Sequence, residues 1–211
     1  MKAIIYFILA IFIIELLPLN KLTAADYVQI VVQSSDPSIS ASDLGKAAVI
    51  MADRLAEAGM KPVQVDLKGT MQIQITLQSS ANLKIAEYLV TRQGAIEFRA
   101  NDTPVMIQAD IDRMVLLKNG DENGLSIQFK PGSVNKWAEV TKRNVNRKIA
   151  VVMDGKVIYD PVLREPITGG NCVITGTFTD EELGCMAAVG NHGPLPAGFV
   201  VVDSPSLRGA K

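Results

Sequence analysis

Side chains able to do chemistry are few in this sequence of 211 residues, which contains one histidine and two cysteines. The histidine, His192, lies between a predicted helix end and Gly193-Pro194, where a helix cap or a surface residue is expected. This position favours a structural role over general-base catalysis, although residue counts leave a nucleophile–histidine pair open. Two cysteines and one histidine without paired spacing fall short of the four ligands of a structural zinc site. The sequence therefore predicts neither a catalytic residue nor a metal site.

The two cysteines have two possible states. Cys172 lies in a predicted strand and Cys185 in the helix that follows it. A disulfide between them is sterically conceivable in an oxidising compartment. Alternatively, both are small buried apolar side chains, as free cysteines often are. Because a sequence does not give the distance between two Cα atoms, we favour buried thiols and leave the disulfide open.

Glycines and acidic residues near Cys172 have structural explanations. Gly169-Gly170-Asn171 and Gly176 lack the Lys-Ser/Thr pair of a phosphate-binding loop, so they predict a bend that leads into a strand. Asp180-Glu181-Glu182 opens a predicted helix, where carboxylates interact favourably with the positive end of the helix dipole. Thr179 and Glu182 have the spacing of a capping box. We therefore expect no cofactor.

The composition limits the classes of partner. Hydrophobic residues make up 48% of the chain and charged residues 20%, which suits an ordinary soluble domain. A formal net charge of −1 provides no basic surface for nucleic acid. Aromatic residues, at 5%, are too few for a base-stacking platform. We therefore expect no nucleic-acid partner, and contact with a membrane only through the amino-terminal segment.

The amino-terminal segment has the pattern of a signal peptide. A basic start precedes the apolar run Ile4–Ile14, and small residues follow up to Ala24 and Ala25. This run is shorter than the roughly 20 apolar residues that span a bilayer, and it is typical of a secretory signal. We expect residues 1–25 to be cleaved after Ala24 or Ala25, with an inner-membrane anchor over residues 4–17 as the alternative. Both interpretations place the folded part outside the cytoplasm.

Hydrophobic periodicity predicts six elements in the amino-terminal half. Leu44, Met51 and Leu55 recur at helical spacing, and Gly59 follows where a left-handed C-cap is expected. In order, the elements are strand Tyr27–Val32, helix Asp43–Ala58, strands Val63–Leu67 and Met71–Leu77, helix Ala81–Thr91 and strand Ala95–Arg99. This order is the ferredoxin-like arrangement, in which two βαβ units form one antiparallel sheet.

A second set of elements follows a predicted domain boundary at Asn101–Asp112, which has no sustained period. The Asp154-Gly155 pair between two apolar runs predicts a hairpin with a type I′ turn. The elements around it are strands Met114–Leu117 and Leu125–Phe129, helix Pro131–Arg143, a strand through Ile174, a capped helix after Thr179 and a last strand, Phe199–Val202.

Short motifs of this region occur together in one known family. They are Gly94-Ala-Ile-Glu97-Phe98-Arg99, Asp154-Gly155-Lys-Val157, Glu165-Pro166-Ile167, Gly169-Gly170, Ile174-Thr-Gly176-x-Phe178, Glu182 and Gly193-x-Leu195-Pro196. In this order and spacing they resemble the large first periplasmic domain of SecD, the accessory membrane subunit of the bacterial Sec protein-export machinery. The resemblance extends from about residue 42 to residue 207 and is strongest after Pro131.

The resemblance implies an α+β fold in which a head is inserted into a ferredoxin-like base. The base is expected over residues 26–100 plus 195–205 and the head over residues 101–194, with Phe199–Val202 returning to the first sheet. The resemblance also implies a periplasmic location and a role in protein translocation, here as a stand-alone exported protein. SecD has further membrane helices, whereas this sequence stops at Lys211, so we expect no proton conduction by this chain alone.

Four residues are candidates for contact with a partner. Trp137 has helical spacing with two valines, which predicts a core position, with the wall of an apolar groove as the alternative. Arg164 and Glu165 lie between two prolines, which predicts a solvated loop or an interaction tip. Phe178 belongs to the motif that resembles SecD.

The predicted function is non-enzymatic binding of an unfolded or translocating polypeptide, or of a Sec or other envelope protein. The first alternative is a structural or adaptor module of the cell envelope with no role in export. The second is an enzyme with an unrecognised site. Binding of unfolded peptides separates the first two, and a deep pocket with convergent polar groups would favour the enzyme.

Overall fold

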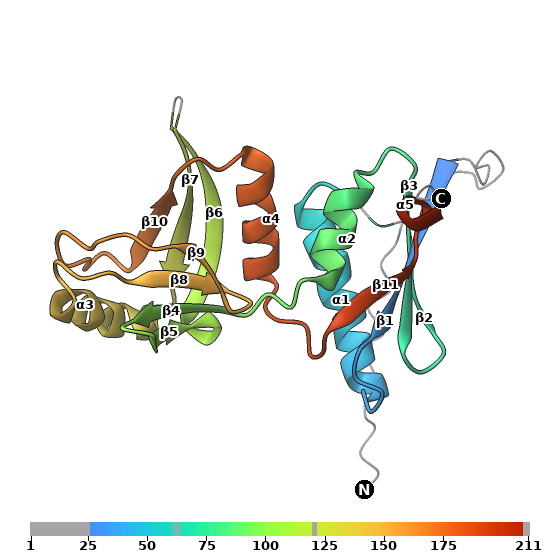
Figure 1. Ribbon diagram of the computed structural model, residues 1–211, viewed down its shortest axis with the longest axis horizontal. Coiled ribbons are helices and arrows are strands. Elements are labelled where there is room, and N and C mark those ends of the chain that lie inside the picture. Colours follow the sequence, from blue (N-terminus) through green and yellow to red (C-terminus); the bar gives the residue numbers. More distant parts are fainter. Residues whose placement is uncertain (1–25, 61, 63, 120–121, 209–211) are drawn as a thin grey trace, which may run out of the picture.

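The computed structural model describes residues 26–60, 62, 64–119 and 122–208, which form two lobes side by side (Figure 1). We call the lobe that contains the first and last described residues the base and the other lobe the head. The predicted signal segment, with Ala24 and Ala25, lies outside the described residues. Among the described residues, no helix is long and apolar enough to span a bilayer.

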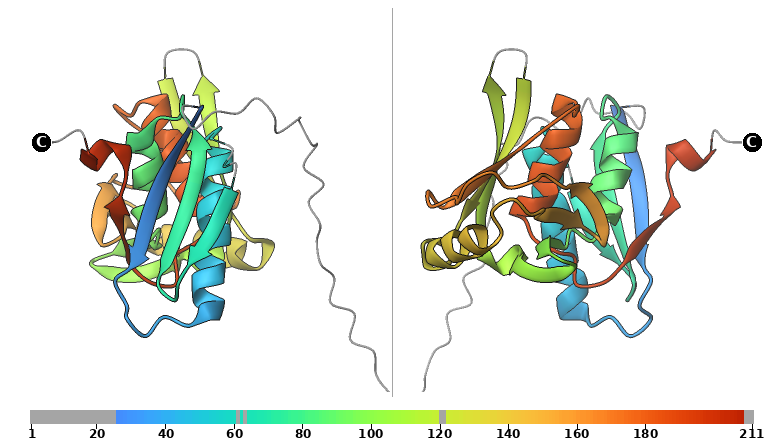
Figure 2. Two further views of the ribbon diagram at one scale, coloured as in Figure 1. Left: turned by 90° about the vertical axis from the view of Figure 1, so that its right-hand side faces the viewer. Right: turned by 60° about the vertical axis from the view of Figure 1, so that its left-hand side comes forward.

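The base is one antiparallel sheet with two helices on one face. Its elements are β1 (Tyr27–Ser34), α1 (Ala41–Glu57), β2 (Gln64–Lys68), β3 (Gln72–Gln78), α2 (Leu83–Thr91), β11 (Phe199–Asp203) and the short α5 (Pro205–Arg208). The strand order is β11-β1-β3-β2. Figure 2 shows α1 and α2 on the side of the sheet that faces the head. Alternate residues of β1 and β3, such as Ile30 and Ile75, are fully buried and pack with Leu44 and Met51 of α1.

The fourth strand of the base sheet comes from the far end of the chain. β11 pairs antiparallel with β1, which confirms the prediction for Phe199–Val202. The prediction that Ala95–Arg99 supplies a base strand is wrong, because β4 (Ile96–Ala100) pairs with head strands. Both segments alternate buried and more exposed residues, and alternation shows only that one face of a strand is covered. The α+β fold is thus confirmed, and this strand order is consistent with a ferredoxin-like base into which the head is inserted.

The head contains two sheets and two helices. Its elements are β4, β5 (Thr103–Ile107), β6 (Ile111–Asn119), β7 (Glu122–Phe129), α3 (Val134–Arg143), β8 (Ala150–Met153), β9 (Lys156–Tyr159), β10 (Asn171–Thr175) and α4 (Asp180–Asn191). One sheet has the order β5-β4-β8-β9 and the other the order β10-β7-β6. In Figure 1, α4 lies between the β10-β7-β6 sheet and the helices of the base.

The segment predicted as a domain boundary, Asn101–Asp112, is structured. It contains β5 and a 3₁₀ turn at Gln108–Asp110. In the sequence, Pro104 argues against a strand. However, β5 is at a sheet edge, where a residue without a backbone N–H is tolerated. We infer that the boundary lies before β4 instead.

Asp110 ties the end of this segment to the start of α3. Its carboxylate accepts hydrogen bonds from Ser133 Oγ at 2.7 Å, Lys136 Nζ at 2.7 Å and the Ile107 amide at 3.0 Å. Burial raises the pKa of Asp110, but the bonds from Lys136, Ile107 and Ser133 lower it more, so the pKa lies below its ordinary value.

Two local predictions for the head are confirmed. The hairpin between β8 and β9 turns at Asp154 and Gly155, with φ angles of 50° and 75°, as a type I′ turn requires. α4 begins with a capping box: Thr179 Oγ1 accepts from the Glu182 amide, and the Glu182 carboxylate accepts from the Thr179 amide at 2.9 Å. Both features fix where the neighbouring elements start.

Three aromatic rings form the centre of the head. Phe98 from β4, Phe129 from β7 and Trp137 from α3 have centroid separations of 4.8–5.4 Å. The two contacts of Phe98 are edge-on, an arrangement favoured by the aromatic quadrupole. Because the three rings come from both sheets and from α3, they hold the layers of the head together.

Candidate functional site

The head contains an apolar cavity of about 270 Å³ between β10 and the connection that follows β9. We call it the head cavity. This volume is near the lower end of the roughly 300–1,000 Å³ that is usual for ligand pockets. Its lining residues are Phe98, Trp137, Ile149, Val151, Tyr159, Pro161, Val162, Leu163, Arg164, Glu165, Ile167, Cys172, Val173 and Ile174. Apolar side chains therefore form most of its surface.

The head cavity brings together most of the candidate residues that the sequence indicated. Trp137, Arg164 and Glu165 line it. Phe178 lies apart, where it is partly buried against the core and close to Gly176. Trp137 is 2% exposed, so both interpretations of this residue hold at once: it is a core residue that also forms part of the cavity wall.

The connection after β9 is held in place by α3 and by the segment before β8. Thr141 of α3, which is fully buried, accepts a hydrogen bond from the Ile167 amide at 3.0 Å. Leu163 donates its amide to Arg147 O at 2.9 Å and accepts from the Asn146 amide at 2.8 Å. This wall of the head cavity is therefore held by hydrogen bonds to α3 and to residues 146 and 147.

The two cysteines are both free thiols and belong to different cavities. Cys172 lines the head cavity, and burial raises the pKa of its thiol from 9.0 to about 12. Cys185 lies in α4 beside a second cavity of about 360 Å³, between α2 and α4. Tyr88 and Met186 line this second cavity, with Glu181 and Glu182 also in its wall. Burial also raises the pKa of Cys185.

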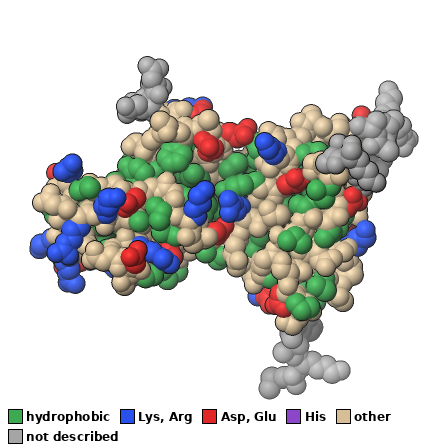
Figure 3. Space-filling view, viewed as in Figure 1, with side chains coloured by type: hydrophobic (Ala, Val, Ile, Leu, Met, Phe, Trp, Pro, Cys, Tyr) green, Lys and Arg blue, Asp and Glu red, His purple; other side chains and the backbone are tan. Residues whose placement is uncertain are grey.

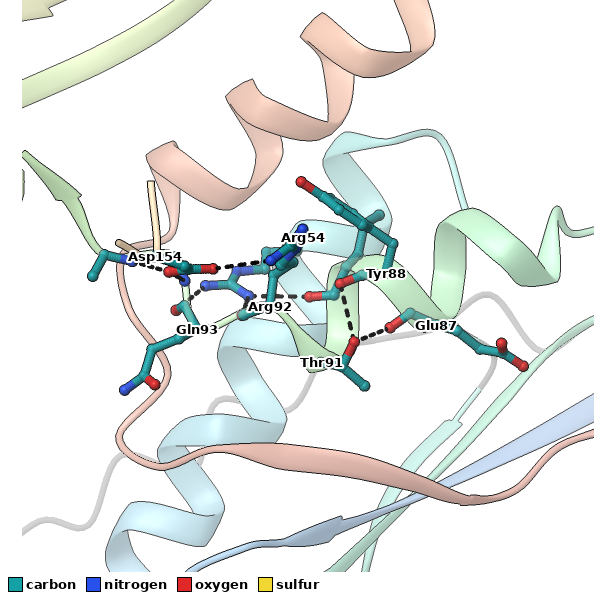
Figure 4. A network of polar contacts seen from close by, with 10 residues as sticks. Arg54, Glu87, Tyr88, Thr91, Arg92, Gln93 and Asp154 are labelled. Atoms are coloured by element: carbon teal, nitrogen blue, oxygen red, sulfur yellow. Dashed lines mark hydrogen bonds and ion pairs between the residues drawn. The ribbon is translucent and has the colours of Figure 1, made fainter. Parts of the chain in front are cut away.

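Arg54, which the sequence analysis did not single out, is a buried clamp at the junction of the two lobes (Figure 4). Its side chain is fully buried and donates to four backbone carbonyls: Leu89 at 3.0 Å, Arg92 at 2.5 Å, Gln93 at 2.9 Å and Gly193 at 2.6 Å. Gln93 and Gly193 lie on the two segments that connect base and head. Burial lowers the pKa of Arg54 to about 10, although Asp154 partly opposes this effect.

Other contacts bind the same two connecting segments. The Leu195 amide donates to Gln93 O at 2.8 Å, which joins one segment to the other. Asp154, in the β8–β9 turn, accepts from the amides of Gly94 at 2.7 Å and Ala95 at 2.8 Å. The hairpin turn of the head is therefore hydrogen-bonded to the chain as it leaves the base.

His192 belongs to this junction. Its Nε2 lies 2.7 Å from Glu57 of α1, and its Nδ1 lies 4.0 Å from Asp53. The neighbouring Asn191 donates to the other Glu57 oxygen at 2.6 Å. This agrees with the predicted role at a helix end, because His192 is the C-cap of α4. Within the described residues, no cluster of His, Cys, Asp and Glu could hold a metal ion.

Comparison with known proteins confirms the resemblance to the first periplasmic domain of SecD. Residues 97–197 match the family model described as the SecDF P1 head subdomain. The protein translocase subunit SecD of Acidaminococcus fermentans is 27% identical over 178 residues, which cover 83% of this chain and 42% of that protein. The chain spans less than half the length of the curated relatives it matches first.

Two solved structures share the fold over most of the chain. A structure of the membrane component SecDF that enhances protein export has 25% identity and a TM-score of 0.69, and the match covers 83% of this chain and 98% of that chain. A crystal structure of SecDF in a super-membrane-facing form has 24% identity and a TM-score of 0.74, with coverage of 86% and 31%. The match extends beyond residues 97–197, so base and head occur together in these structures.

Proposed function

Because the chain resembles the first periplasmic domain of SecD over most of its length, we propose that it binds unfolded polypeptide during protein translocation. The binding is non-enzymatic and takes place in the head cavity, on the periplasmic side of the inner membrane. We assign no coupling of proton movement to protein export to the residues described here, and we assign that coupling to the membrane part of the relatives.

The observation that carries this proposal is the apolar head cavity within the part of the chain that matches the SecDF P1 head. An unfolded chain exposes apolar side chains, whose transfer from water into such a cavity is favourable by roughly 25 cal/mol per Å². The walls contribute aromatic and aliphatic surface, and the charged residues of the lining, Arg164 and Glu165, are exposed at its edge. This arrangement suits binding of apolar segments with little sequence preference.

Titration of the full chain with short unfolded peptides tests the proposal. The sequence contains one tryptophan, and Trp137 lies in the cavity wall, so its fluorescence reports on this site alone. We expect a saturable emission change with a dissociation constant below about 1 mM. A titration with no saturable signal, by fluorescence and by calorimetry, at millimolar peptide would contradict the proposal.

A matched pair of variants locates the binding. Val173 on β10 is 39% exposed and lines the head cavity, whereas Val202 on β11 is 43% exposed and lies in the base. Both valines are on strands at the edge of a sheet. We expect Val173→Asp to weaken peptide binding roughly fivefold or more and Val202→Asp to leave it unchanged. Equal effects of the two changes would place binding elsewhere.

A further inference from the structure

The head cavity runs along the edge of β10. It contacts Cys172, Val173 and Ile174, which are consecutive residues. Successive side chains of a strand point to opposite faces of the sheet, so a cavity on one face would contact alternate residues only. Contact with three in a row, including the exposed Val173, agrees with a cavity that reaches the strand edge. β10 pairs with β7 on one side and is the edge strand of its sheet.

The opposite wall of the head cavity is a second backbone edge. Residues 161–165 all line the cavity, again in an unbroken run. Within this run, Leu163 exchanges backbone hydrogen bonds with residues 146 and 147. In an antiparallel pair the backbone groups of successive residues point alternately to the two sides. Those of Val162 and Arg164 are therefore directed away from residues 146–149, and both residues line the cavity.

A buried donor without a partner lies in the same wall. Trp137 is 2% exposed, and its indole Nε1 has no hydrogen-bond partner among the described residues. A buried N–H group that lacks an acceptor is unfavourable, because it has given up its hydrogen bond to water without replacement. Because Nε1 is itself buried, a carbonyl oxygen in the head cavity would satisfy it only after the Trp137 side chain shifts toward the cavity.

The edge of the cavity carries balanced charge. Arg164 and Glu165 are adjacent and exposed, and neither has an ion-pair partner among the described residues. Their opposite charges give no net attraction for an anion such as a lipid phosphate. They are complementary to a polypeptide, whose flanking side chains carry either sign.

From these features we propose that the ligand of the head cavity is an extended polypeptide segment that adds as a strand between β10 and residues 161–165. Its backbone pairs with the free edge of β10, alternate side chains enter the apolar cavity, and one carbonyl oxygen accepts from Trp137 Nε1. This inference rests on the proposed function and specifies how the polypeptide is recognised. β10 has five residues, so at about 3.3 Å per residue the paired segment is roughly 16 Å long.

Backbone-modified peptides test the mode of binding. One probe is an eight-residue peptide of Val, Ile and Thr with a terminal Lys. The second has the same side chains but N-methyl groups on alternate amides, which remove donors and block pairing along a strand edge. Binding to the full chain is measured by calorimetry. We expect the methylated peptide to bind at least tenfold more weakly.

A variant tests the role of the indole donor. Trp137→Phe keeps an aromatic ring but removes the N–H group, and we expect roughly fivefold weaker binding of the unmodified peptide. If this variant unfolds at a lower urea concentration than the parent chain, the comparison of the two peptides on the parent chain still decides whether the peptide pairs along the strand edge. A Trp137→Phe variant that folds normally and binds the peptide as tightly as the parent refutes the contact with the indole.

The possible outcomes separate this inference from the proposed function. If both peptides bind equally well, side chains alone are recognised, so polypeptide binding stands and strand addition is refuted. If neither peptide binds, both proposals fall. If a lauryl-chain detergent below its micelle concentration binds while the peptides do not, the cavity holds an acyl chain and both proposals fall.

Discussion

Replacement of Arg54 by methionine tests how the two lobes are held together. The guanidinium donates to four carbonyls, and bonds that involve a charged group contribute roughly 1.5–3 kcal/mol each, about 6–12 kcal/mol in sum. The cost of burying the charge offsets a large part of this sum, as the lowered pKa and the unpartnered Nε indicate. Methionine fills a similar space but removes these donors, and of the four carbonyls Gln93 O still accepts from the Leu195 amide. We therefore expect Arg54→Met to destabilise the chain by about 3–5 kcal/mol, because buried carbonyls that lose their donor cost roughly 1–3 kcal/mol each.

Urea denaturation followed by circular dichroism measures this effect. Arg54→Lys retains the charge but not the planar fork of donors, so its stability should fall between those of Arg54→Met and the parent chain. Arg143→Met is the matched control, because Arg143 is 78% exposed and, within the described part of the chain, forms an ion pair with Glu139 alone, at 3.4 Å. We expect the control to change stability by less than about 1 kcal/mol. If Arg54→Met costs no more than Arg143→Met, the clamp does not hold the lobes together.

Three further predictions follow from the same structure. Gly94→Ala should destabilise the chain by about 2–4 kcal/mol in urea denaturation, whereas the control Gly59→Ala should cost about 1 kcal/mol. Both glycines have positive φ, but a Cβ at Gly94 would collide with Arg54 and Val189, whereas a Cβ at Gly59 would meet open space. Equal losses of stability in the two variants would contradict the collision. Asp110 has a lowered pKa in the folded chain, so the stability it contributes is present at neutral pH and is lost as the pH falls through that pKa. Asp110→Asn should therefore be less stable than the parent chain at pH 7, and its free energy of unfolding should decline less steeply below about pH 4. An unchanged dependence of stability on pH in the acid range would count against this. Cys172, with a pKa of about 12, should react with iodoacetamide at pH 8 roughly a hundredfold more slowly than a free thiol. Mass spectrometry of the alkylated chain measures this rate. Alkylation as fast as that of glutathione would contradict the burial of the Cys172 thiol.

The proposed function depends on the side chains that face the head cavity and not on the fold alone. Figure 3 shows hydrophobic side chains gathered on the face of the head seen there, with Lys and Arg side chains at the end where α3 lies. Lys142 and Arg143 are in the last turn of α3. A fold can serve several functions, so the tests at Val173 and Trp137 are more informative than further structural comparison.

The candidate site was only partly predictable. Trp137 and the Arg164-Glu165 pair could be identified because their residue types and flanking prolines are unusual, and all three line the head cavity. Phe178 could not be placed from its motif, because a motif does not specify which side of a bend a ring occupies. Arg54 could not be identified either. An arginine on a helix is normally exposed, and its partners are backbone carbonyls at residues 89–93 and 193, which carry no sequence signal.

The sequence by itself determined the features that depend on neighbouring residues. The Asp154-Gly155 turn and the Thr179–Glu182 capping box are correct because positive φ angles and free helix amides are satisfied within a few residues. Tertiary structure alone decided which sheet each strand joins, since alternation is the same for β4 and β11, and pairing depends on contacts with residues far away in the chain. It also decided the buried position of Arg54 and the space between β10 and residues 161–165. Both arise only when segments distant in sequence meet, and no local pattern encodes that meeting.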